Sequence, residues 1–100
     1  MTARFTPGAR EQFLRVISYI LADSPSAALS FQNRASDTLQ RLIKFPESGR
    51  LIPEFPDLSY REVIVGNYRF FYRLKAHTVW IVAVWHGAQL PRSPEQKGGG

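Results

Sequence analysis

The sequence contains no cysteine among its 100 residues and only two histidines, His77 and His86. A thiol nucleophile, a disulfide framework and a cysteine-ligated zinc site are excluded, and a histidine-based metal site is not expected. There is also no glycine-rich phosphate loop, so we predict neither a metal nor any other cofactor. No apolar run reaches membrane-spanning length, and the opening stretch MTARFTPGAR lacks the apolar segment of a signal peptide. These absences predict a cytoplasmic protein with no membrane partner.

Basic side chains are in excess. Thirteen Lys and Arg residues stand against eight Asp and Glu, which gives a formal net charge of +5. This balance favours contact with a polyanion or an acidic protein, although it is also compatible with a role in solubility alone. Hydrophobic residues make up 44% of the chain, enough for one packed core. We predict one domain over residues 1–91 and a flexible tail over residues 92–100, which are polar and rich in Pro and Gly.

Two helices are predicted in the first half of the chain. Thr6-Pro7 and Ser24-Pro25 each combine an N-capping side chain with a proline suited to a first helical turn. Apolar residues at helical spacing follow each signal. The first set is Phe13, Val16, Ile17, Ile20 and Leu21, and the second is Ala28, Phe31, Ala35, Leu39 and Leu42. The short join between them predicts an antiparallel αα-hairpin.

Strands are predicted in the second half. The connector 45–59 holds three prolines and a glycine, so neither a helix nor a central strand runs through it. Its Glu54 and Asp57 are predicted to be turn and surface residues. REVIV, YRFFYRL and TVWIVAVW then alternate as strands do, separated by turns at Gly66-Asn67 and Ala76-His77. With a short edge strand at 3–5, the order is β-α-α-β-β-β. We therefore predict an α+β fold in which the αα-hairpin packs on one face of a small antiparallel sheet.

The turns also predict which side chains share a face. Two-residue loops place Ile64 opposite Arg69, Phe71 opposite Val82 and Arg69 opposite Val84. The face toward the helices then holds Val63, Val65, Tyr68, Phe70, Tyr72, Leu74, Val79, Ile81, Ala83 and Trp85. The other face holds Glu62, Ile64, Arg69, Phe71, Arg73, Lys75, Trp80, Val82, Val84 and His86. This second face has two interpretations. It is either an ordinary solvated surface, on which Arg69 or Arg73 pairs with Glu62 and lies over Trp80, or a shallow cationic site that binds phosphate, transfers a proton and stacks on a base.

Three stretches in this order resemble the RelE/ParE superfamily of toxins, the plasmid-stabilisation-like proteins of bacterial type II toxin–antitoxin modules. They are FTPGAREQFLRVISYI, then FPESGRLIPEFPDLSYREVIVGNYRFFYRL, then VAVWHGAQLP. The resemblance implies the same fold, a cytoplasmic growth inhibitor and a cognate antitoxin partner. It also implies one of two activities. RelE-like members cleave ribosome-bound mRNA, whereas ParE-like members poison DNA gyrase without cleaving nucleic acid.

The resemblance also suggests site residues. Arg69 matches an arginine that RelE-like enzymes place near the scissile phosphate, and His86 matches a strand-end histidine of some nucleases, so these two are the candidate catalytic residues. The candidate binding residues are Arg50, Arg61, Arg69, Phe71, Arg73, Lys75, Trp80 and His86. The chain has Ala88-Gln89 where the nucleases carry a second arginine, and it has no C-terminal tyrosine. We therefore expect a ParE-like gyrase inhibitor. A ribosome-dependent endoribonuclease and a degenerate member that only binds a protein partner remain the alternatives.

Overall fold

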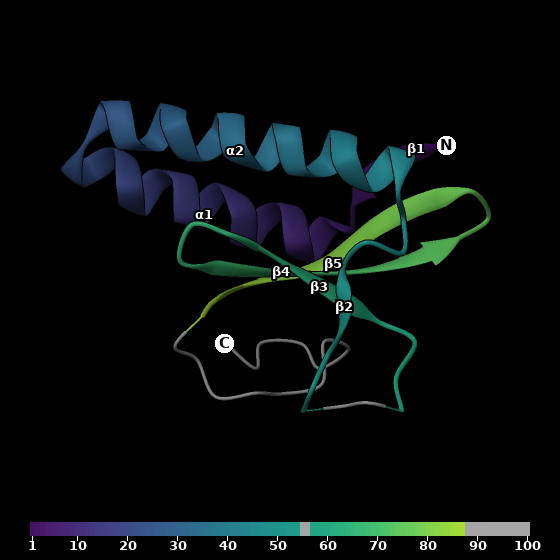
Figure 1. Cartoon of the computed structure of the whole chain (residues 1–100). Helices are drawn as coiled ribbons and strands as arrows, with labels where there is room; N and C mark the ends of the chain where they lie inside the picture. The colour runs from purple at the N-terminus through teal and green to yellow at the C-terminus, as the bar shows by residue number, and fades with distance from the viewer. Residues whose placement is uncertain (55–56, 88–100) are drawn as a thin grey trace.

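The computed structural model describes residues 1–54 and 57–87, and two helices lie on one face of a five-stranded sheet (Figure 1). The predicted tail at 92–100 and the positions Ala88-Gln89 lie outside these residues. The strands are β1 (Thr2–Phe5), β2 (Arg50–Leu51), β3 (Arg61–Val65), β4 (Tyr68–Lys75) and β5 (Thr78–His86), and the helices are α1 (Pro7–Asp23) and α2 (Pro25–Lys44). This arrangement confirms the predicted α+β class. Neither helix is both long and apolar enough to cross a membrane, within the residues described.

Both predicted helix starts are confirmed. The Thr6 side chain accepts a hydrogen bond from the Ala9 N–H, and the Ser24 side chain accepts one from the Ala27 N–H, each over 3.2 Å. These bonds satisfy backbone donors that the first turn leaves without helical partners. Leu21 was predicted to face the core but is 50% exposed. It lies in the last turns of α1, where the hairpin extends past the sheet (Figure 1).

The sheet is mixed and not purely antiparallel. Its strand order is β1-β5-β4-β3-β2, and β1 runs parallel to β5 while the other neighbours are antiparallel. Residues far apart in the chain form the β1–β5 pair, so no hairpin turn imposes an antiparallel direction on it. The connector adds the two-residue strand β2, which the sequence did not predict. It pairs Arg50 with Glu62 and Leu51 with Arg61.

The register of β5 changes at a β-bulge. The β3–β4 register is as predicted, and so is the pairing of Arg73 with Trp80. Tyr72 then pairs with Ile81, but Phe71 pairs with Ala83, which leaves Val82 as an extra residue. Because a strand's side chains alternate in direction, one extra residue exchanges the faces of all later ones. The predicted faces of Ala83, Val84, Trp85 and His86 are therefore wrong.

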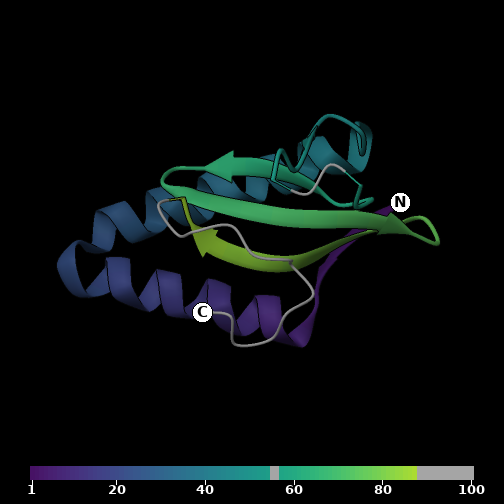
Figure 2. The same cartoon turned by 90° about the horizontal axis from the view of Figure 1, so that it is seen from below.

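Each face of the sheet carries its own apolar cluster. The larger one lies under the helices and includes Phe31, Phe70 and Val84. The smaller one lies on the opposite face, which we call the outer face and which Figure 2 views from below. Ile52 of the connector and Tyr60, just after it, take part in this outer cluster. The other members of the outer cluster are Phe71, Ala83 and Trp85, with Leu58 and Val82 packed against them. The outer face predicted to be a binding surface is thus partly covered by the connector.

Candidate functional site

Arg69 is the central residue of the predicted site, and its charge is already paired. It is the second residue of β4, on the outer face, and its side chain is only 8% exposed. Its Nε donates to Glu62 Oε1 over 2.6 Å, and its Nη2 donates to Glu54 Oε1 over 2.9 Å. The guanidinium carbon also lies 5.1 Å from the centre of the Phe71 ring. Two carboxylates therefore take up two of the five N–H donors, and the low exposure leaves little access for a phosphate to the rest.

Four alternating charges join the connector to the sheet. Glu62 is fully buried and also accepts a hydrogen bond from Arg50 Nε over 2.6 Å. The order Arg50–Glu62–Arg69–Glu54 has no net charge, and we call it the charge chain. The hydrogen bond from Arg69 lowers the pKa of Glu54, more than burial raises it. Burial would lower the pKa of Arg69, but the two carboxylates together raise it. Glu54 and Arg69 therefore stay ionised at neutral pH.

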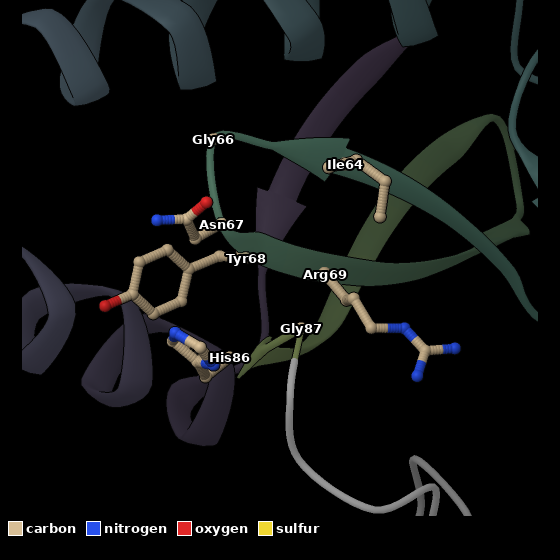
Figure 3. A pocket seen from close by; sticks show the side chains of 7 residues that line it. All are labelled: Ile64, Gly66, Asn67, Tyr68, Arg69, His86 and Gly87. Carbon is tan, nitrogen blue, oxygen red and sulfur yellow. The ribbon is translucent and has the colours of Figure 1, made fainter.

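His86 does not lie beside the Arg69 guanidinium. The bulge turns His86 toward the Tyr68 side of the sheet, and the two rings meet edge to face with centroids 5.3 Å apart. Figure 3 shows His86 and Tyr68 together while the Arg69 guanidinium points away from both. The hollow there has a volume of about 460 Å³ and is lined by Ile64, Gly66, Asn67, Tyr68, Arg69, His86 and Gly87. Arg69 and His86 thus do not form an assembled acid–base and phosphate-binding pair.

Three further predicted binding residues hold the connector in place. The Arg61 guanidinium donates to the carbonyl of Gly49 over 2.8 Å, and it lies 4.0 Å from the Glu47 carboxylate. Arg50 belongs to the charge chain. Phe71 is 1% exposed and packs edge to face against Trp85, with ring centroids 5.0 Å apart. The Phe71 ring is therefore covered and presents no face on which a base could stack.

The remaining predicted residues gather at the other end of the outer face. Arg73 pairs with Trp80 across β4 and β5, and Lys75 follows on the same face of β4. They line an open hollow of about 690 Å³, the Trp80 hollow, whose other lining residues are Thr6, Pro7, Tyr60, Ala76, Thr78 and Val82. The Arg73 guanidinium carbon lies 5.8 Å from the centre of the Tyr60 ring. Within the described part of the chain, neither Arg73 nor Lys75 forms an ion pair.

The sequence analysis identified one of the two acidic partners. Pairing of Arg69 with Glu62 was one of its interpretations and is confirmed, whereas Glu54 was taken as a turn and surface residue and its bond to Arg69 was not predicted. The Glu62 contact could be predicted because the predicted register places Glu62 diagonally from Arg69. Long side chains of opposite charge can pair from such positions. Glu54 lies in an irregular connector, where no periodicity fixes the direction of a side chain.

Comparisons with known proteins agree on the family. The family model described as "ParE toxin of type II toxin-antitoxin system, parDE" matches residues 3–91. A solved chromosomal ParDE system from P. aeruginosa superposes with a TM-score of 0.67 at 15% identity, over 86% of this chain and 95% of that one. The toxin–antitoxin complex RelBE2 from Mycobacterium tuberculosis gives a TM-score of 0.53 at 25% identity, over 85% and 95%. No curated protein sequence matches the chain.

The match covers both helices and all five strands. The resemblance inferred from the sequence is therefore confirmed at the level of the superfamily. The chain belongs to the ParE toxins of type II toxin–antitoxin systems.

Proposed function

We propose that the chain inhibits cell growth by binding DNA gyrase in the cytoplasm, without catalysing a reaction, and that a cognate antitoxin neutralises it. The observation that carries the proposal is the pairing of Arg69 with Glu62 and Glu54. An arginine that stabilises a phosphorane-like transition state needs donors directed at the reacting phosphate. In this chain those donors are directed at two carboxylates, one of them fully buried.

The position of His86 gives independent support. A general acid or base must lie within hydrogen-bond reach of the reacting group that its partner residues hold. His86 instead lies beside Tyr68, directed away from the Arg69 guanidinium (Figure 3). A nuclease built on Arg69 and His86 would need both side chains to change position. A protein inhibitor does not need these two side chains to lie together. The match of the family model to the ParE toxins points the same way.

An antitoxin partner is supported by charge and by the solved relatives. One of these relatives is itself titled a toxin–antitoxin complex. The net charge of +5 suits an acidic partner. A growth inhibitor of this kind acts inside the cell that makes it, so the partner must be made alongside it. We expect the adjacent reading frame to encode that partner and its co-expression to restore growth.

The purified full-length chain should inhibit gyrase-catalysed supercoiling of relaxed plasmid and should not cut mRNA in a ribosome assay. His86→Gln is the matched variant, because it removes the proton-transfer group from an exposed position. It should inhibit gyrase as the parent chain does. Ribosome-dependent mRNA cuts that disappear in His86→Gln would contradict the proposal and establish the nuclease. If expression had no effect on growth, the chain would instead be a partner-binding member of the family without toxicity.

A further inference from the structure

The Trp80 hollow combines aromatic surface with two cations that form no ion pair among the described residues. Trp80 is half-buried, so part of its indole surface faces the hollow, and the ring of Tyr60 forms part of the same lining. Arg73 and Lys75 flank these rings, and among residues 1–54 and 57–87 no Asp or Glu belongs to the lining. The two cations also lie apart from the charge chain, which is neutral overall. Excess positive charge on the outer face is therefore concentrated at this hollow.

The spacing of the cations suits consecutive charges along an extended polyanion. Arg73 and Lys75 are two residues apart on one strand, which separates their Cα atoms by roughly 7 Å. Both side chains are long enough to adjust to two neighbouring phosphates. Trp80 lies directly across from Arg73, so an aromatic ring adjoins the first cation. A cationic track beside an exposed ring is the arrangement by which proteins bind single strands without reading their sequence.

We propose that the Trp80 hollow binds single-stranded nucleic acid, with one base stacked on Trp80 and the adjoining phosphates held by Arg73 and Lys75. The proposed contact is one of binding alone and includes no bond cleavage. It goes beyond gyrase inhibition and does not depend on it, since the hollow would bind a strand whatever protein the toxin inhibits. The open hollow, with a volume of about 690 Å³, has room for one base and its neighbouring phosphates.

An acidic peptide is the competing occupant, and the backbone around Trp80 disfavours it. The strand that carries Trp80 is paired on both sides there, with Arg4 of β1 and Arg73 of β4. A peptide lying across the indole would find no backbone groups of β5 left to pair with, and its own amides would lose water without compensation. A base presents an apolar face to the ring and keeps its polar edge in solvent. A nucleic acid therefore fits this hollow better.

The test uses the full-length chain and a fluorescein-labelled oligothymidylate, followed by fluorescence anisotropy over a series of salt concentrations. Trp80→Ala should raise the dissociation constant about tenfold. Arg73→Ala and Lys75→Ala should each reduce the slope of log K against log salt by about 0.7. The matched control is Arg41→Ala, an exposed arginine on α2 in the helical layer, which should leave both quantities unchanged.

Intrinsic fluorescence gives a second reading that does not depend on Trp80→Ala keeping its fold. The unlabelled oligonucleotide should quench tryptophan emission in the parent chain and in Trp85→Phe, whose indole is buried in the outer cluster. The same titration should produce no quenching in Trp80→Phe. Binding and quenching that persist in Trp80→Phe, or a salt slope unaffected by Arg73→Ala, would overturn the proposal. So would an oligoglutamate peptide that competes with the oligonucleotide at equal strength.

Discussion

The Nε atom of Arg69 lies 2.6 Å from Oε1 of Glu62, and neither side chain is accessible enough to exchange that partner for water. Two adjacent strands supply the pair, and the connector adds a charge at each end, Arg50 and Glu54. Removing one member of a buried pair leaves the other charge desolvated without compensation. The charge chain therefore makes the fold sensitive to substitutions at a position that sequence resemblance assigns to catalysis.

Glu62→Ala should lower the free energy of unfolding by about 3 kcal/mol or more, because it leaves Arg69 buried with only Glu54 as partner. Glu11→Ala is the control, since its pair with Arg15 joins two well-exposed side chains and should contribute less than about 0.5 kcal/mol. Urea unfolding of both variants measures the difference. Equal losses of unfolding free energy in the two variants would mean that the buried Arg69–Glu62 pair stabilises the fold no more than an exposed pair does.

Arg69→Ala should be destabilised to a similar extent, about 3 kcal/mol, because Glu62 would then be buried with Arg50 alone. Any loss of toxicity in this variant must therefore be compared with its thermal unfolding curve. If Arg69→Ala proved as stable as the parent chain and yet non-toxic, a direct functional contact of the guanidinium would be indicated instead.

The bond between Glu54 and Arg69 should make part of the stability depend on pH. The pKa of Glu54 is below its ordinary value of 4.5 in the folded chain, so this carboxylate contributes stability at neutral pH and loses it as the pH falls through the folded-state pKa. Glu54→Gln should be less stable than the parent chain at neutral pH by under about 1 kcal/mol, since the side chain is one-third exposed. The difference in the free energy of unfolding between Glu54→Gln and the parent chain, measured by urea unfolding, should disappear in acid. A difference that stayed constant would exclude the carboxylate as its cause.

Gly49 should not tolerate a side chain. A Cβ atom there would lie 2.5 Å from the Tyr72 hydroxyl and 2.8 Å from the Glu62 carbonyl oxygen. The Tyr72 hydroxyl accepts a hydrogen bond from the Gly49 N–H and donates one to the Pro46 carbonyl, so it cannot move without losing both. We expect Gly49→Ala to cost about 2 kcal/mol in a thermal unfolding experiment. Gly8→Ala, with nothing within 4 Å of the new atom, should instead be neutral or stabilising.

The helices and the first hairpin could be predicted because their signals are local. Capping residues, apolar spacing and Gly66 in a tight turn all act within a few residues of the structure they specify. The bulge at Val82 has no such signal. The run from Ile81 to Trp85 is apolar throughout, so either register places hydrophobic side chains on both faces of the sheet. The outcome depends on the outer cluster, in which Ile52 of the connector and Tyr60 join Trp85 and make burial on the outer face possible.

The predicted binding residues fall into two groups, again because of contacts between distant parts of the chain. The sequence showed that cations and aromatics share a face, but not which of them the connector covers. Arg61 and Arg69 bond to connector residues, Arg50 of the connector bonds to Glu62 of β3, and Phe71 lies in the outer cluster. Arg73, Lys75 and Trp80 instead lie around an open hollow that Tyr60 also lines. These contacts join residues distant in the chain, and no periodicity within a single strand specifies them.

Substitutions in the second hairpin turn, Ala76-His77, should increase the stability of the fold. Ala76 and His77 have φ angles of 50° and 64°, in the left-handed region that costs residues other than glycine roughly 1 kcal/mol each. A double substitution of Ala76→Asn and His77→Gly supplies the pair best suited to such a turn and should raise the free energy of unfolding by about 1 kcal/mol. Gly66→Ala tests the opposite direction, since Gly66 has a φ of 59° and alanine there should lose about 1 kcal/mol. The thermal unfolding midpoints of the two variants should therefore shift in opposite directions. A double variant no more stable than the parent chain would show that the turn at Ala76-His77 carries no strain.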